Sequence, residues 1–318
     1  MIECPWCASS VILVNSVCPE CRQEVLPEHL EAAIVEWDDE PVSNEQEQED
    51  EISRINRDGW SRKTYEAWVK RNGTPEEHAS RLRDDPWKKL APFQAWLGDV
   101  RGKRIANLLG SNGKTAVSLA LLGADVTVVD ISPENARYAL DLARAAGVNI
   151  RYIVSDVMRI PPEERPAECD IVVMELGILH WIMDIERFFL IVREMLRDGG
   201  RIIVRDFHPV KRSLLQWEDG RMVASGHYFD NTPREGDVPY AFILSDEERK
   251  ELSRVVTRGW TMGQIVTAIA DAGLVIRLLH EESGPIQRWV FPPEAGEGIE
   301  DRIPGIYTLV ADRWDRTG

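Results

Sequence analysis

The 318-residue chain lacks the features that mark secreted and membrane-bound proteins. No uninterrupted apolar run reaches the roughly 18 residues that suggest a membrane-spanning helix. The N-terminus, Met-Ile-Glu-Cys-Pro, has neither the basic region nor the apolar core of a secretory signal. We therefore expect a cytoplasmic protein with no membrane contact. No internal repeat is evident either.

Positive charge is scarce in one part of the chain. Residues 23–53 contain twelve Asp and Glu and no Lys or Arg, so that −12 of the net charge of −16 lies there and −4 remains elsewhere. Neither part has the basic surface that nucleic-acid binding requires, which disfavours a nucleic-acid partner. An acidic run poor in aromatics cannot bury enough surface to order itself, and it predicts a solvated linker over 36–53. The competing interpretation is a binding site for a basic partner.

Cysteine is almost absent beyond the first 22 residues, where only Cys169 occurs. The other four form two C-P-x-C turns, which are Cys4, Cys7, Cys18 and Cys21. Two such turns present four thiolates to a tetrahedral metal and resemble zinc ribbons and rubredoxin-like modules. We predict a closed, structural zinc site in a module over 1–35, which also offers a surface for a protein partner. Iron or redox chemistry stays open, whereas a cytoplasmic setting disfavours disulfides.

Residues 54–98 favour helices and are rich in aromatics, including Trp60 and Tyr65. These helices either pack on the main domain or close over a ligand. We expect them to form a helical cap.

From residue 103 onward, apolar strands alternate with helices, which indicates a parallel sheet covered on both faces. The pattern predicts strands at 104–109, 125–130, 151–155, 170–175, 201–206, 274–280 and 306–312. It predicts helices at 114–122, 184–197 and 261–272, and a further helix that begins at Ser132-Pro133. The fold class is therefore α/β, with a domain over 99–318. An irregular insertion over 207–258 follows the carboxyl end of a strand, where substrate-shaping elements belong.

The turn Gly110-Ser-Asn-Gly-Lys-Thr115, followed by Asp130 at the end of the next strand, indicates a nucleoside cofactor. A dehydrogenase fingerprint needs glycines at a spacing that this turn supplies only in part. A phosphate loop of the kind found in ATP-dependent Mur-type ligases resembles Gly-Ser-Asn-Gly-Lys-Thr, but Leu108 stands where its first glycine belongs. That interpretation also gives no reason for Asp130.

Five stretches in order resemble the class I S-adenosylmethionine (SAM)-dependent methyltransferases. They are Asn107–Gly113, Val126–Ser132, Ser155–Val157, Asp170–Gly177 and Leu196–Val204. The resemblance implies a Rossmann-like, doubly wound seven-stranded sheet whose last strand is antiparallel. The chain departs from the family at Asn107, where an acid is usual, and at Leu109 and Ser111, where glycines are usual.

The resemblance also implies a set of cofactor contacts. Asp130 would bind the ribose, Ile131 would cover the adenine, and Asp156 beside Val157 would accept from the adenine amino group. Glu175 and Leu176 would lie beside the methyl group. The remaining cofactor positions would be Asn107, Gly110, Ser111, Asn112 and Gly113 in the turn, with Trp60 and Tyr65 closing over it.

The chemistry at the methyl group is an in-line displacement, which depends on alignment and needs a base only if the acceptor arrives protonated. We expect His180, His208 and Glu175 as catalytic candidates, and His227 with Tyr228 as contacts of the acceptor. The sequence favours a small-molecule acceptor modified at an O, N or C atom. Three alternatives stay open: an rRNA or tRNA methyltransferase, a SAM-binding regulator without enzymatic activity, and an ATP-dependent ligase.

Overall fold

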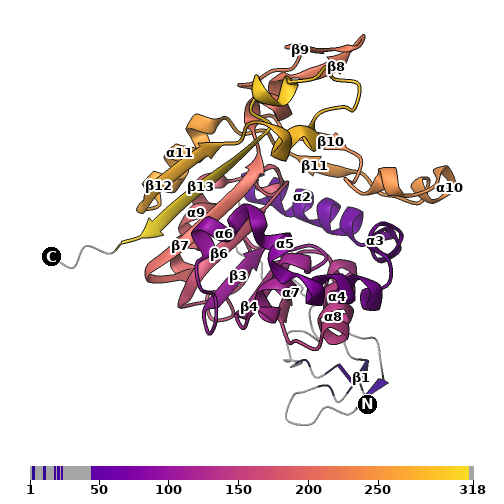
Figure 1. The fold of residues 1–318 in the computed structure, drawn as a ribbon, viewed down its shortest axis with the longest axis vertical. Coiled ribbons are helices and arrows are strands. Elements are labelled where there is room, and N and C mark those ends of the chain that lie inside the picture. The colour runs from indigo at the N-terminus through magenta and orange to yellow at the C-terminus, as the bar shows by residue number, and fades with distance from the viewer. Residues whose placement is uncertain are drawn as a thin grey trace.

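The computed structural model describes residues 2–3, 10–11, 18, 20–21, 23 and 44–314. A seven-stranded sheet with the order β12-β13-β7-β6-β3-β4-β5 forms its centre (Figure 1). Its strands are β3 (Arg104–Leu108), β4 (Asp125–Asp130), β5 (Arg151–Val154), β6 (Cys169–Glu175), β7 (Leu196–Phe207), β12 (Leu274–Glu281) and β13 (Ile306–Arg313). β13 runs antiparallel to both of its neighbours, and the other pairs are parallel. The predicted α/β class and mostly parallel sheet are confirmed.

Helices cover both faces of this sheet, because successive strand residues point to opposite sides. Ile105 packs in the cluster formed with α7 (Lys114–Leu121) and α8 (Pro133–Ala146). The adjacent Ala106 packs instead with α9 (Ile185–Met195) and α11 (Met262–Asp271). The sheet is therefore doubly wound, as the sequence predicts.

The predicted N-terminal helices pack on the α7–α8 face. They are α3 (Thr64–Asn72), α4 (Pro75–Asp84), α5 (Pro86–Leu90) and α6 (Gln94–Leu97). A capping box at Thr74 and Glu77 starts α4, with Pro75 at its first position. Trp68 and Phe93 are buried in the same core cluster as α8. In the part of the chain that the structure describes, no helix is both long and apolar enough to cross a bilayer.

The acidic segment differs from its prediction, because α2 spans Asn44–Trp60 and so includes most of the expected linker over 36–53. Asp50 forms an ion pair with Arg159, and the hydroxyl of Ser53 donates to Asp156 over 2.6 Å. Ile52 packs in a small cluster with Met183 and Val256. These partners lie more than a hundred residues further along the chain. The composition of the acidic segment alone could not reveal them.

Two further boundaries differ from the sequence reading. The helix predicted to reach 197 ends at Met195, and β7 begins at Leu196, so that Gly199 and Gly200 lie within the strand. Gly200 sits where an added Cβ would lie 2.7 Å from the carbonyl oxygen of Cys169. Gly200 thus allows β7 to pass close to β6, and neither glycine ends the helix.

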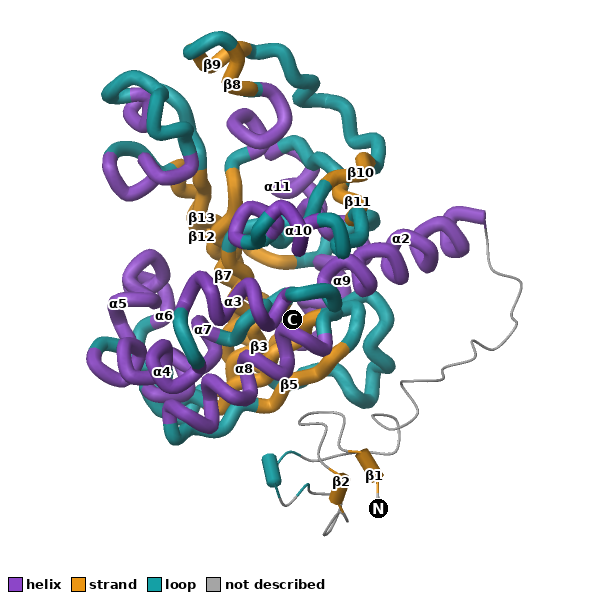
Figure 2. Tube along the Cα trace, turned by 90° about the vertical axis from the view of Figure 1, so that its right-hand side faces the viewer, coloured by secondary structure: helices purple, strands orange, loops and turns teal. Residues whose placement is uncertain are grey.

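The insertion over 207–258 contains regular structure that the sequence reading did not predict. Its strands pair as two antiparallel ladders, β8 (Gln216–Glu218) with β9 (Arg221–Val223) and β10 (Arg234–Gly236) with β11 (Val255–Thr257). The amide of Asn56 on α2 donates to the Val256 carbonyl and accepts from the Val256 N–H, at 2.9 and 2.7 Å. The hydroxyl of Tyr240 donates to the carbonyl of Gly59. Figure 2 shows α2 running alongside β10 and β11.

One ion pair lies in the interior between β7 and the end of β12. The guanidinium of Arg205 contacts both carboxylate oxygens of Glu282, at 2.6 and 2.8 Å. The two side chains are only 3% and 6% exposed. Removing one partner of such a pair leaves the other charge buried without compensation.

We expect the Arg205→Met substitution to lower the free energy of unfolding by about 3–5 kcal/mol, because it leaves Glu282 buried and unpaired. The double substitution Arg205→Met with Glu282→Leu should recover most of that loss. Urea unfolding followed by circular dichroism measures both. The matched control is Arg254→Met at the exposed pair with Asp237, which should cost less than about 1 kcal/mol. Equal losses for Arg205→Met and the control would contradict the prediction.

Candidate functional site

A cavity of about 650 Å³ opens at the carboxyl ends of β3, β4, β5, β6 and β7. Helices α2 and α3 and the insertion form its remaining walls. The carboxyl edge of a parallel sheet is where ligands bind in α/β folds. Twelve residues singled out from the sequence line the cavity, namely Trp60, Asn107, Gly110, Ser111, Asn112, Asp130, Ile131, Asp156, Val157, Glu175, Leu176 and His180.

The turn after β3 has an unusual backbone. Leu109 and Ser111 have φ angles of 47° and 49°, in the left-handed region that favours glycine. These are the two positions where the chain departs from the glycines of the family it resembles. Between them, a Cβ on Gly110 would lie 2.6 Å from the Val128 side chain and 2.8 Å from Asn107 Oδ1. Only glycine fits at position 110, whereas the flanking residues take a strained conformation with side chains.

Gly113 has a role in packing and does not line the cavity. It precedes α7 with a φ of 71°, and a Cβ there would lie 2.5 Å from the Cβ of Ala139 on α8. The missing side chain therefore lets α7 approach α8 closely. Its neighbour Asn112 does line the cavity and accepts from the N–H of Lys114 over 3.3 Å.

Asp130 ends β4 and is held by the chain itself. Its Oδ1 accepts from the N–H of Ser132 and from Nδ2 of Asn135, at 2.9 and 3.0 Å. Its Oδ2 accepts from the N–H of Ser111 at 2.9 Å. Burial raises the pKa of this carboxyl, and the three hydrogen bonds oppose that rise. Of the roughly four acceptor positions on a carboxylate, one remains open.

Asp156 follows β5 and connects the sheet to α2. Its Oδ1 accepts from the N–H of Met158 at 2.9 Å, and its Oδ2 accepts from Ser53 Oγ. Arg159 lies 3.7 Å from the same carboxylate. The acidic helix α2 therefore covers the end of the cavity that Asp130 and Asp156 line.

Charged groups of both signs meet where β6 ends. Glu175 Oε2 accepts from Thr115 at 2.9 Å and forms an ion pair with Lys89. Burial would raise the pKa of Glu175, but Lys89 and Lys114 outweigh it and hold that pKa below its ordinary value. Burial and the charge of Lys89 lower the pKa of Lys114 to about 8. Glu175 therefore stays ionised at neutral pH. Lys114 has a pKa about one unit above neutral pH.

Asn107 presents an unsatisfied polar atom at this cavity. Its Nδ2 donates to the carbonyl of Val173 at 3.2 Å. Its Oδ1 is buried and has no hydrogen-bond partner among the residues that the structure describes. A buried acceptor without a partner is costly, so this oxygen suits a donor on a ligand.

Asp206, near the end of β7, fixes the turn that follows β6. Its Oδ1 accepts from the N–H groups of Gly177 and Phe207, at 2.5 and 2.7 Å. Its Oδ2 accepts from the N–H groups of Ile178 and Leu179, at 3.1 and 2.9 Å. The turn leads directly to His180, which lines the cavity. Burial lowers the pKa of His180 well below its ordinary value, with the charge of Arg212 acting in the same direction, so the imidazole is neutral at pH 7.

Five predicted site residues lie outside the cavity lining, namely Tyr65, Gly113, His208, His227 and Tyr228. His208, a predicted catalytic candidate, does not join His180: its Nε2 lies 2.8 Å from Glu281 at the end of β12, and its ring packs edge-on against Tyr307. β7 continues to Phe207, which lines the cavity, whereas the side chain of the next residue, His208, contacts β12 and β13.

The other positions outside the lining have structural partners or are exposed. The hydroxyl of Tyr65 donates to Asp141 at 2.9 Å. The hydroxyl of Tyr228 accepts from the N–H of Met262 at 2.9 Å, and His227 is exposed. The insertion therefore reaches the cavity through other residues, including Pro239 and Phe242.

The cysteine pairs of the predicted zinc module are only half described. Cys4 and Cys7 lie outside the described residues, Cys18 is buried and Cys21 is half-buried. The described parts of the chain contain no group of three or more His, Cys, Asp or Glu side chains placed to hold a metal. Cys169 opens β6, and burial raises the pKa of its thiol to about 12, which makes it a packing residue.

Several cavity residues have no role in the sequence prediction. Lys114 and Thr115 appear there only within the phosphate-loop alternative, although they directly follow the second glycine of the turn. Ser53 of α2 and Arg212 of the insertion carried no local signal. Their proximity depends on long-range packing of segments that a single sequence does not relate.

Comparisons with known proteins agree with the fold. Residues 109–204 match the profile of a family described as a methyltransferase domain. A SAM-dependent methyltransferase from Mesorhizobium loti is 24% identical, with a TM-score of 0.53, over 73% of this chain and 100% of the other. A candidate SAM-dependent methyltransferase from Listeria monocytogenes is 18% identical, with a TM-score of 0.52, over 72% of this chain and 98% of the other. No curated protein matches the chain.

The two likenesses establish a shared fold, and the profile match places a methyltransferase domain on residues 109–204.

We expect Lys114 to titrate near pH 8, as the burial and charges around it require. Carbon-13 NMR of the reductively methylated protein measures this, with Lys114→Met used to assign the signal. Glu175→Gln should lower the pKa of Lys114 further, because the Glu175 charge raises it. Lys88→Met, an exposed neighbour of Lys89, is the control and should leave the titration unchanged. A Lys114 signal that titrates near the usual value of about 10.4 would contradict the prediction.

The same shift has a consequence for stability. Between pH 8 and about 10.4 the unfolded chain holds a proton on residue 114 that the folded protein has lost. The free energy of unfolding of the wild type, relative to Lys114→Met, should therefore rise with pH across that window. Urea unfolding at pH 7.5 and 9.5 tests the sign, and a fall with pH would show that the folded pKa is not depressed.

Proposed function

We propose that this chain, an enzyme with a methyltransferase domain on the class I SAM-dependent fold, binds SAM in its cavity and methylates a small-molecule acceptor at an O, N or C atom. One observation carries the proposal. Asp130 ends β4, Asp156 follows the adjacent strand β5, and both line one cavity together with the turn Gly110–Asn112. A nucleoside bound along this edge would meet acceptors for its hydroxyl and amino groups in that order.

The adenosine half of the cofactor would lie against β4 and β5. Asp130 keeps one open acceptor position for a ribose hydroxyl, and Ile131 offers an apolar surface for the adenine. Asp156, with Val157 beside it, would accept from the adenine amino group. The Ser53 hydroxyl of α2 occupies the same carboxylate and brings the helix over this end of the cavity.

The methionine half would lie against the turn after β3. Asn107 Oδ1, which lacks a partner among the described residues, suits the ammonium group. Lys114 suits the carboxylate, because it lines the cavity and Glu175 is the one anion that raises its pKa. Glu175 and Leu176 would then lie next to the reacting methyl group.

When bound, SAM supplies an electrophilic methyl group on a positively charged sulfur. The residues of the chain align an acceptor with it and exclude water, which is the main requirement of an in-line displacement. The neutral His180 is a weak base, and ionised Glu175 has its charge committed to Lys89 and Lys114. The site therefore suits an acceptor atom that arrives deprotonated or needs little help to lose its proton.

The enclosure of the cavity by α2, α3 and the insertion supports a small acceptor. An RNA substrate would need a basic groove that leads to the methyl group. Here the helix that covers the cavity is acidic, with Glu47, Glu49, Asp50 and Glu51 in its first turns.

The zinc module remains part of the proposal. In the cytoplasmic setting that we propose, thiols stay reduced and can bind metal. The four thiols of Cys4, Cys7, Cys18 and Cys21 would together form a closed donor set suited to structural zinc. Such a site lacks an open coordination position and would have no part in methyl transfer. The module would instead stabilise the N-terminal region or recruit a protein partner.

We expect Asp130→Asn to weaken binding of S-adenosylhomocysteine (SAH), the product of methyl transfer, about ten- to hundredfold, because a hydrogen bond to a charged group contributes about 1.5–3 kcal/mol. Isothermal titration calorimetry measures the affinity, and a thermal melt checks that the variant folds. Asp125→Asn, at the exposed start of the same strand, is the matched control and should bind normally. Unchanged affinity of a folded Asp130→Asn variant, or tight binding of ATP–Mg²⁺ without SAH binding, would overturn the proposed site.

We expect about one zinc ion per chain in the purified protein, measured by plasma mass spectrometry. Cys18→Ser should release it, because a four-thiolate site is weakened when one ligand is lost. Cys169→Ser is the control and should retain the metal, since Cys169 is buried in the sheet. A metal-free wild type, or equal zinc in both variants, would refute the zinc module.

A further inference from the structure

Arg212 lies at the end of the cavity opposite to Asp130 and Asp156. It belongs to a π-helical turn, Val210–Leu214, that follows β7. In the sheet order, β7 and β6 lie on one side of β3, and β4 and β5 lie on the other. Arg212 lines the cavity beside Phe207 and His180, past the position where Glu175 ends β6. It therefore faces the space that the cofactor would leave for an acceptor.

The charge of Arg212 is not matched within the described parts of the chain. Its guanidinium makes no hydrogen bond or ion pair with any described residue, and partial desolvation by the surrounding protein lowers its pKa although the residue is exposed. The carboxylate that acts on it is Asp206, whose two oxygens already accept from four backbone N–H groups. The side chain is accessible, and the surface around it is that of the cavity. A guanidinium remains protonated even there, so it suits an anion brought by a ligand.

Several other cations line the cavity, and one of them, Arg71 on α3, lies over the Phe242 ring at 5.7 Å from the ring centroid. Arg159 forms ion pairs with Asp50 and Asp156 on the adenosine side. Lys114 lies close to Glu175 at the turn after β3. Arg212 is the cation that lies beside Phe207 and His180, and it has no hydrogen-bonded or ion-paired partner among the described residues.

Aromatic side chains line the cavity. Trp60 and Trp181 pack edge to face with their ring centroids 5.7 Å apart. Phe207 and Trp289 do the same at 6.0 Å, and Trp289 is 56% exposed. Exposed aromatic surface that lines a cavity suits a flat, apolar ligand.

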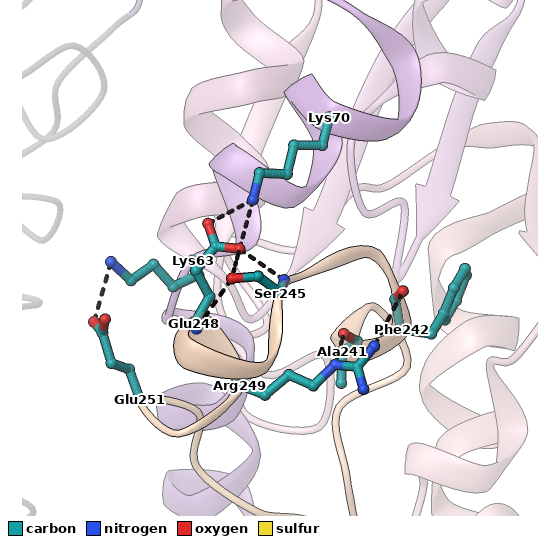
Figure 3. A network of polar contacts seen from close by, with 8 residues as sticks. All are labelled: Lys63, Lys70, Ala241, Phe242, Ser245, Glu248, Arg249 and Glu251. Atoms are coloured by element: carbon teal, nitrogen blue, oxygen red, sulfur yellow. Dashed lines mark hydrogen bonds and ion pairs between the residues drawn. The ribbon is translucent and has the colours of Figure 1, made fainter.

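A polar network positions a further aromatic ring of the cavity lining, that of Phe242. Figure 3 shows the segment 241–251 docked against α3, where Lys70 contacts Glu248 at 2.5 Å and Lys63 contacts Glu251 at 3.0 Å. Arg249 donates to the carbonyl groups of Ala241 and Phe242, at 2.9 and 3.4 Å. The ring of Phe242 is 68% exposed and lines the cavity. The hydrogen bonds and ion pairs of the insertion therefore fix the position of this ring.

We propose that the acceptor is a flat, largely apolar molecule that carries one carboxylate, and that Arg212 binds this carboxylate while the aromatic residues cover the body of the molecule. The inference rests on the proposed function, because it places the acceptor beside the SAM methyl group. A guanidinium forms two parallel hydrogen bonds with a carboxylate, which orients the molecule as well as holding it. One guanidinium matches the single charge of a carboxylate, and phenyl phosphate tests whether Arg71 supplies a second cation for a dianion.

The experiment compares acids with their neutral amides on the SAH-loaded protein. The probes are benzoate, indole-3-acetate and 4-coumarate, each paired with its amide, together with phenyl phosphate. We expect at least one acid to bind about tenfold more tightly than its amide, as measured by calorimetry or ligand-observed NMR. Arg212→Gln should remove this preference, whereas Arg212→Lys should retain part of it. Arg221→Gln, at an exposed position of the same insertion, is the control and should bind as the wild type does.

A separate titration with SAH keeps the two proposals distinguishable. Arg212→Gln should bind SAH as tightly as the wild type, because Arg212 lies away from the cofactor side. If neither the wild type nor the Arg212→Gln variant binds SAH, the proposed function fails. The acid–amide comparison is then made on the protein without SAH. The carboxylate proposal is overturned if no acid binds better than its amide, if phenyl phosphate binds better than every acid, or if Arg212→Gln keeps the preference.

Discussion

The carboxylate of Asp206 is the constraint on which the geometry of the cavity depends. Four backbone N–H groups converge on its two oxygens, and three of them belong to the turn after β6. A buried carboxylate is tolerated only when its acceptor positions are filled, so the turn and the strand β7 fix each other. The turn in turn determines where His180 faces the cavity. It also leaves the neighbouring Arg212 without a carboxylate of its own.

Acidic and basic side chains line different parts of the cavity. On the side of β4 and β5, Asp130 and Asp156 are anions that the chain already supplies with donors, and they keep limited capacity for a ligand. Beyond β6, Arg212 is a cation with no acceptor from the described chain. Between them, Lys89, Lys114 and Glu175 bring both signs together at the carboxyl end of the sheet. This separation of charge along the sheet edge would favour one orientation of the cofactor and the acceptor.

The sequence was sufficient for the sheet and for the residues that end its strands, because strand period, glycine positions and the order of the five motifs are local properties. It was insufficient where order arises from distant partners. The acidic run became helix α2 because Asp50, Ser53 and Ile52 find Arg159, Asp156 and Met183. The position of His208 depended on how far β7 continues, which pairing with β13 determines. The exposed insertion resembled irregular chain because its short strands pair over only three residues each.

Helix α2 covers the cavity through a few polar contacts and a small apolar cluster. The Asp50–Arg159 ion pair, the Ser53–Asp156 hydrogen bond and the Asn56–Val256 backbone pairing hold it there. Salt screens the Asp50–Arg159 ion pair, whereas the buried Asn56 pairing does not depend on ionic strength. A ligand in the cavity would therefore be covered by the segment whose composition looks least structured.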